Sequence, residues 1–225
     1  MRNKIDLSPN YSKKTRKLKD IKFVIIHYTG MQSEIESIKR LKDPQKKVSS
    51  HYLINRKGEI IKMVKDQKTA WHAGKSRWKN FVNLNRFSIG IELVNKGHEF
   101  GYQKFPIIQI KSLINLCKNL KKKYKIKKVH FLGHSDIAPL RKVDPGEKFP
   151  WQKLSKYNLG TWYKKNIKNI KIKEDKKRMF FFKNIHQIGY RYFSLKQKMI
   201  NKDKKIIKAF QRRFLPKRVT GNLDQ

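Results

Sequence analysis

Cysteine is nearly absent from this sequence, since Cys117 is the only one among 225 residues. A single cysteine forms no internal disulfide, so the fold must rest on its core, and the redox compartment is not indicated. Cys117 falls among apolar residues that recur at helical spacing, so we interpret it as a small buried hydrophobe. This interpretation disfavours a cysteine-peptidase function.

Long apolar runs are missing as well. No stretch approaches the roughly 18 consecutive apolar residues of a membrane-spanning helix, so we predict that the protein is not transmembrane. The first twenty residues are basic and polar, and they lack the apolar segment of a secretion signal. We therefore favour the cytoplasm as the location, with the periplasm or cell wall as the alternative.

Acidic residues are scarce: 16 Asp and Glu stand against 57 Lys and Arg, which gives a formal charge of +41. A charge of this size attracts polyanions, so nucleic acid and an anionic cell-wall surface are both candidate partners. The lysines are spread over the whole length, however, and no nucleic-acid-binding motif is present. We therefore expect no specific nucleic acid and interpret most of the charge as a general compositional bias.

The hydrophobic pattern predicts strands that alternate with helices. Short apolar runs typical of strands lie at residues 21–26, 50–55, 59–64, 88–95 and 129–132. Helical patterns lie at residues 34–41, where Ser33 and Glu36 form a capping box, then after Pro106, near 154, towards Gly189 and at 206–214. This alternation predicts an α/β domain with a central mixed sheet flanked by helices.

Three potential metal donors follow the ends of apolar segments or a stiff turn. His27 ends the run at residues 23–26, His134 directly follows Gly133, and Asp144 precedes a Pro-Gly pair ten residues later. Two neutral imidazoles and one carboxylate leave the fourth position of a tetrahedral zinc ion open, which is typical of a catalytic site. Taken singly, each residue has a simpler explanation as a rim histidine, a helix-cap neighbour or a turn aspartate.

Four motifs occur in a fixed order: IIHYTG, AWHAG, IGIELVN and GHSDIAP followed by KVDPG. Together they resemble the zinc-dependent N-acetylmuramoyl-L-alanine amidases, which have the peptidoglycan-recognition-protein fold. The resemblance covers about residues 20–160. It implies a hydrolase that cleaves the amide bond between the lactyl group of N-acetylmuramic acid and L-alanine, in peptidoglycan or muropeptides. It also implies Zn2+ bound by His27, His134 and Asp144.

The resemblance assigns the catalytic roles to Glu92 and Lys142. Glu92 lies within an apolar strand pattern, where a carboxylate is costly to bury unless it is paired or faces a wet cavity. The alternative is an outward-facing residue on an exposed sheet face. By resemblance Glu92 is the general base, and Lys142, two residues before Asp144, stabilises the oxyanion.

The segment Trp71–His72–Ala73 resembles the substrate-side loop of the family. Its small Ala73-Gly74 pair allows a sugar or peptide backbone to approach closely. Trp71 offers a ring for stacking on a sugar, although core packing explains a loop tryptophan equally well. We expect His72 to line the cleft as a polar contact and not to bind the metal.

We predict a basic N-terminal arm at 1–20, a catalytic domain at 21–164 and a lysine-rich helical tail at 165–225. The tail resembles part of a small peptidoglycan-binding module. Two alternatives stay open for the function: a non-catalytic muropeptide-binding module of the same fold, and a basic nucleic-acid-associated protein. Intact peptidoglycan and anhydro-muropeptides both stay open as the substrate.

Overall fold

A computed structural model of the chain describes residues 3–163 and 172–223. Its centre is a six-stranded sheet in the order β1-β5-β4-β9-β3-β10. These strands are β1 (Asn3–Ile5), β3 (Phe23–Tyr28), β4 (Tyr52–Ile54), β5 (Ile60–Lys62), β9 (Ser88–Leu93) and β10 (Phe131–Gly133). Strand β3 runs parallel to β9 and β10, whereas β4 and β5 pair antiparallel. The predicted mixed sheet is confirmed.

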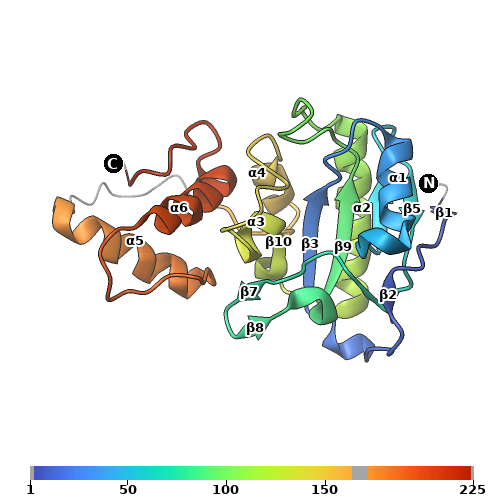
Figure 1. Cartoon of the computed structure of the whole chain (residues 1–225), viewed down its shortest axis with the longest axis horizontal. Helices are drawn as coiled ribbons and strands as arrows, with labels where there is room; N and C mark the ends of the chain where they lie inside the picture. The colour runs from blue at the N-terminus through green and yellow to red at the C-terminus, as the bar shows by residue number, and fades with distance from the viewer. Residues whose placement is uncertain (1–2, 164–171, 224–225) are drawn as a thin grey trace.

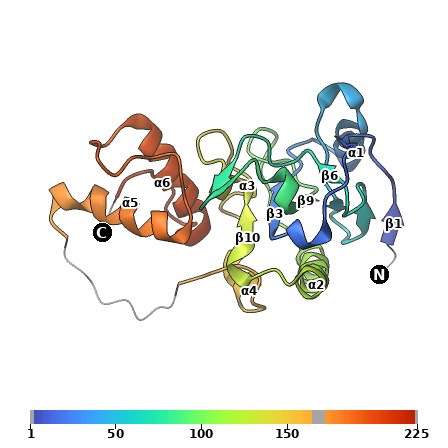
Figure 2. The same cartoon turned by 90° about the horizontal axis from the view of Figure 1, so that it is seen from below.

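Helices flank this sheet on both faces (Figures 1 and 2). The α-helices are α1 (Glu34–Lys42), α2 (Ile107–Tyr124), α3 (His134–Ile137), α4 (Trp151–Ser155), α5 (Glu174–Ile188) and α6 (Asn201–Phe214). In Figure 2, α2 lies on one side of β3 and β9, and α1 lies on the other. Each helix in residues 3–163 and 172–223 is too short or too polar to cross a membrane.

Shorter elements fill the connections. They are the strands β2 (Tyr11–Ser12), β6 (Thr69–Ala70), β7 (Arg77–Trp78) and β8 (Phe81–Val82), and 3-10 turns at Leu18–Asp20, Pro44–Lys46, Leu84–Phe87 and Lys128–His130. Residues 65–87, between the strands predicted at 59–64 and 88–95, contain three of these strands. The segment predicted as an arm adds β1 to the sheet edge, parallel to β5. Farther along the same segment, Arg16 is buried and donates to the backbone carbonyls of Asp66 and Ser88.

Local sequence signals explain the helix and hairpin boundaries. The Ser33 side chain accepts from the Glu36 N–H and the Glu36 carboxylate accepts from the Ser33 N–H, so the predicted capping box opens α1. Gly58 has φ +85° at the turn between β4 and β5, a conformation that favours glycine. Cys117 is fully buried on the apolar face of α2, as its spacing predicted.

Alternation along the strands sends neighbouring side chains to opposite faces. Val24 and Ile26 of β3 pack in the core under α2, together with Ile89 and Ile91 of β9. Phe23 and Ile25 pack in a second core on the opposite face. His27 continues the second set, so its side chain lies on the face away from α2.

Helices α5 and α6 lie together beside β10 (Figures 1 and 2). They share an apolar core with the sheet domain, and Asp136 in α3, a buried carboxylate, adds a polar connection. It accepts hydrogen bonds from the Gly133 N–H, the Tyr190 hydroxyl and the Arg213 guanidinium. Arg213 also lies 3.9 Å from the ring centroid of Trp151. These helices lie within the predicted tail, whose residues 165–171 are outside the described part of the chain.

Replacing Arg213 with Met should lower the free energy of unfolding by about 3–5 kcal/mol, because the buried Asp136 carboxylate would lose its charged partner. Urea denaturation measures this change. Lys205→Met, on an exposed position of the same helix, is the matched control and should change stability by about 0.5 kcal/mol or less. Equal unfolding midpoints for R213M and K205M would contradict the importance of this ion pair.

Candidate active site

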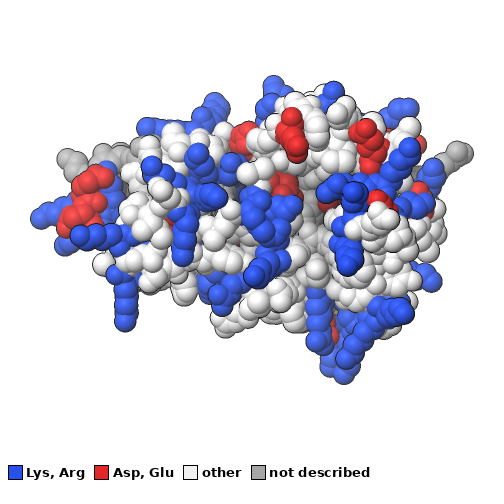
Figure 3. All heavy atoms as spheres, in the orientation of Figure 1, with Lys and Arg blue, Asp and Glu red and all other residues white. Residues whose placement is uncertain are grey.

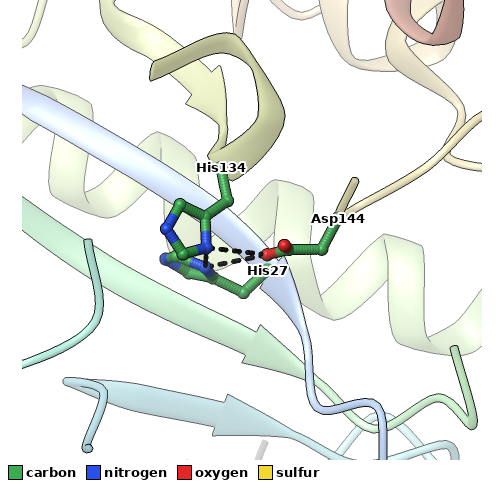
Figure 4. A group of neighbouring side chains, drawn as sticks. All are labelled: His27, His134 and Asp144. Carbon is green, nitrogen blue, oxygen red and sulfur yellow. Dashed lines mark hydrogen bonds and ion pairs between the residues drawn. The ribbon is translucent and has the colours of Figure 1, made fainter. Parts of the chain in front are cut away.

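Strand pairing brings the predicted metal ligands together. Ile26 of β3 is the register partner of Gly133 of β10, so His27 and His134 leave neighbouring parallel strands at the same level. The loop that carries Asp144 is attached beside them by a hydrogen bond from the Ser135 N–H to the Asp144 carbonyl at 2.9 Å. Figure 4 shows the two rings and the carboxylate pointing toward one another.

The three donor atoms form a nearly equilateral triangle. His27 Nδ1 lies 3.0 Å from His134 Nδ1 and 3.0 Å from Asp144 Oδ2, and His134 Nδ1 lies 3.1 Å from the same oxygen. Tetrahedral zinc with bonds of about 2.0–2.1 Å keeps its donor atoms about 3.3 Å apart. All three residues are buried, and together they form a group able to hold a metal ion. The geometry and donor types therefore fit a zinc ion.

The protonation states of these groups also suit a cation. Burial, together with the neighbouring His134, lowers the pKa of His27 to about 4. Burial acts to raise the pKa of Asp144, but His134 and His27 outweigh it and hold that pKa well below its usual range. At neutral pH the site therefore offers a neutral imidazole at His27 and an ionised carboxylate, which are the forms that bind metals.

A cavity of about 330 Å³ opens beside these donors, with His27, His134, Asp144, Glu92 and Lys142 among its lining residues. Glu92 is the register partner of His27 across β3 and β9, so both side chains lie on the face away from α2. The strand pattern left open an outward-facing Glu92 on an exposed sheet face. In the structure Glu92 is only 8% exposed and lines the cavity.

Glu92 Oε2 has no hydrogen-bond partner among the described residues. Burial, together with the negative charge of Asp144, raises the pKa of Glu92 to about 8. A buried, unpaired carboxyl group with a raised pKa is a strong proton acceptor when ionised, which suits a general base. Lys142 lines the same cavity, as do Arg40 and Arg141, and its role at an oxyanion stays a prediction.

Three residues were predicted to contact substrate, and of these His72 alone lines the cavity: the others are Trp71 and Ala73. Trp71 Nε1 donates to Ser12 Oγ at 3.1 Å, and among the described residues Trp71 is not part of the cavity lining. His72 reaches the cavity and lies 3.0 Å from His27. Ala73 is buried beside His134. Their contact with substrate stays a prediction.

Arg141 is a site residue that sequence reasoning missed. Its guanidinium donates to the carbonyls of Ala73 and Lys75 and lies at the cavity, which joins the AWHAG segment to the loop that carries Lys142 and Asp144. Its position next to Lys142 is the one available signal. Among 57 basic residues, nothing else in the sequence distinguishes it.

A sequence model of the N-acetylmuramoyl-L-alanine amidase family matches residues 17–147. The chain belongs to the N-acetylmuramoyl-L-alanine amidase family. N-acetylmuramoyl-L-alanine amidase AmiD of Escherichia coli is 35% identical over 230 residues, which cover 91% of this chain and 78% of AmiD. The 1,6-anhydro-N-acetylmuramyl-L-alanine amidase AmpD of Haemophilus influenzae is 35% identical over 164 residues, covering 65% of this chain and 86% of AmpD.

Two solved amidase structures share the fold over nearly the whole chain. AmiD from E. coli, in complex with anhydro-N-acetylmuramic acid-L-Ala-D-γ-Glu-L-Lys, superposes with a TM-score of 0.78 at 32% identity and covers 93% of this chain and 86% of its own. AMPDH3 from Pseudomonas aeruginosa, in complex with anhydromuramic pentapeptide, gives 0.79 at 29% identity and 96% and 91% coverage. The predicted fold and enzyme class, a hydrolase of the amide bond between muramic acid and L-alanine, are confirmed.

Replacing His134 with Ala should weaken zinc binding by more than about 100-fold, because loss of a donor atom exceeds the usual effect of losing an outer partner. Competition with a chromophoric chelator measures the affinity. His186→Ala, in the exposed part of α5, is the matched control and should bind zinc like the wild type. Unchanged zinc affinity in H134A would exclude this residue as a ligand.

Proposed function

We propose that His27, His134 and Asp144 hold Zn2+ and that the chain cleaves anhydro-muropeptides between the lactyl carbonyl and L-alanine. The observation that carries this proposal is the buried triangle of donor atoms beside the unpaired Glu92 carboxylate. The substrate class is supported by the two amidases of the same fold that bind anhydro-muramyl peptides. Intact peptidoglycan is the second candidate substrate.

Zinc bound at these ligands would supply a Lewis acid that polarises the scissile carbonyl and makes water a better nucleophile at neutral pH. The remaining steps belong to side chains of the chain itself. Glu92 accepts a proton as water adds to the carbonyl carbon, and it then donates that proton to the departing amine of L-alanine. The carbon–nitrogen bond breaks, and the lactyl group leaves as a carboxylic acid.

We infer that Lys142 stabilises negative charge on the carbonyl oxygen. It lines the cavity and belongs to the same loop as Asp144, so the ligand and the oxyanion donor are placed by one backbone segment. An ammonium group aimed at developing charge in a water-poor site gives more stabilisation than it would in bulk water. This role explains a lysine directly beside the metal site.

A non-catalytic binding module of the same fold is the less favoured alternative. Such a module needs neither three converging donor atoms nor a buried, unpaired carboxylate beside them, and this chain has both features. The basic surface gives a separate expectation for the partner. Figure 3 shows Lys and Arg side chains spread over this face from one end of the molecule to the other, without a single stripe. We propose that this charge attracts anionic cell-wall polymers and no specific nucleic acid.

Replacing Glu92 with Gln should lower kcat by at least about 100-fold while zinc stays bound, because the amide side chain cannot accept the proton. The assay is release of peptide from purified anhydro-muropeptide and from muropeptide with a reducing end, each with and without a chelator. Metal content is measured on the same samples. Glu174→Gln, an exposed change in α5, is the control for loss of one negative charge.

Three results would overturn parts of this proposal. Full activity in E92Q would exclude Glu92 as the base. Full activity after complete metal removal would exclude the metal-dependent reaction. Faster release from the reducing-end substrate than from the anhydro form would reverse the preferred substrate class.

A further inference from the structure

Each metal-ligating histidine has one ring nitrogen toward the proposed metal and the other bonded to the AWHAG segment. His27 Nε2 lies 3.0 Å from His72 Nδ1, and His134 Nε2 lies 3.2 Å from the Ala73 carbonyl oxygen. Two consecutive residues of one loop therefore contact the outer nitrogens of both imidazoles. This arrangement gives His72 and Ala73 a part in the metal site that is separate from contact with substrate.

The contact with Ala73 favours one tautomer of His134. A carbonyl oxygen can only accept a hydrogen bond, so its contact at 3.2 Å favours a proton on His134 Nε2, whereas Arg141, which can only donate, lies slightly farther from that nitrogen, at 3.3 Å. Arg141 donates to the same carbonyl and holds it in place. His134 Nδ1 is then left with a lone pair toward His27 and Asp144.

A chain of three hydrogen bonds fixes the tautomer of His27 in the same way. The Ser88 hydroxyl donates to the Leu84 carbonyl at 2.7 Å, which uses its single proton. Ser88 Oγ must therefore accept from His72 Nε2, 3.1 Å away. His72 Nδ1 is left as an acceptor, so His27 Nε2 donates to it. His27 Nδ1 is left with its lone pair toward the other two donors.

The AWHAG segment is itself held rigidly. Asn85 Oδ1 accepts from the backbone N–H groups of both His72 and Ala73, at 3.1 and 2.6 Å. Gly90 gives the His72 ring its space, because a Cβ at that position would lie 2.4 Å from His72 Cγ. His72 is only 6% exposed, so its orientation is set by the protein and not by solvent.

We propose that His72 and the Ala73 carbonyl are positioning groups that orient His27 and His134 for the metal by fixing both tautomers. This inference rests on the metal site of the proposed function. Outer hydrogen-bond partners of metal-bound histidines typically change metal affinity about 10–100-fold when they are removed. Gly90 of the IGIELVN motif makes room for the ring of His72 of the AWHAG motif, and His72 in turn orients His27.

The test compares two substitutions of similar shape. His72→Leu removes the acceptor for His27 Nε2, whereas His72→Asn restores an oxygen acceptor near the position of Nδ1. H72L should bind zinc about 10–100-fold more weakly than the wild type, and H72N should stay within about tenfold of it. Chelator competition gives the affinity, and thermal unfolding shows whether both variants are folded.

Nitrogen-15 NMR of the histidine rings gives a second readout that does not depend on activity. In the zinc-loaded wild type, the His27 Nε2–H should show a strong hydrogen bond to His72 Nδ1, and Ser88→Ala should weaken that bond although the His72 ring remains. Wild-type zinc affinity in H72L would overturn the inference. Equal loss in H72L and H72N would also overturn it, because the acceptor would then not be the cause. A wild-type protein that binds no zinc would overturn the proposed metal site as well.

Discussion

The pairing of β3 with β9 on one side and β10 on the other is the constraint on which the site depends. All three strands are parallel, so their carboxyl ends meet at one edge of the sheet, where ligands bind in open α/β sheets. The register sets His27 beside Glu92 and places His134 at the end of β10. A shift of one residue in either pairing would turn a functional side chain to the face of α2 and remove it from the cavity.

Burial strongly influences the protonation states of the side chains at this edge. It keeps His27 neutral, while the adjacent histidines keep Asp144 ionised, and both states favour a bound cation. The same burial raises the pKa of Glu92, whose Oε2 atom has no hydrogen-bond partner among the described residues. One environment therefore gives two carboxylates opposite tendencies, one suited to binding metal and the other to accepting a proton.

The sequence predicted those strands and helix boundaries that depend on neighbouring residues alone. Alternating apolar runs gave the strands, helical spacing gave α2, and the Ser33 capping box gave the start of α1. The resemblance supplied the three ligands, and the structure brings them together. The pairing of Asp136 with Arg213 could not be predicted, because it joins residues 77 positions apart and neither side chain carries a local signal. The addition of β1 to the sheet edge also depends on a distant partner, β5.

The four sequence motifs form one hydrogen-bonded unit in space, which explains their residue types better than substrate contact alone. IIHYTG contributes His27, AWHAG contacts the outer ring nitrogens of His27 and His134, and IGIELVN contributes Glu92 and the space for His72. The last motif contributes His134, Asp144 and Lys142. Within each motif the positions are fixed by strand alternation and by single hydrogen bonds. Between AWHAG and IGIELVN, Asn85 and Ser88 add hydrogen bonds to His72, so part of this connection belongs to the same unit.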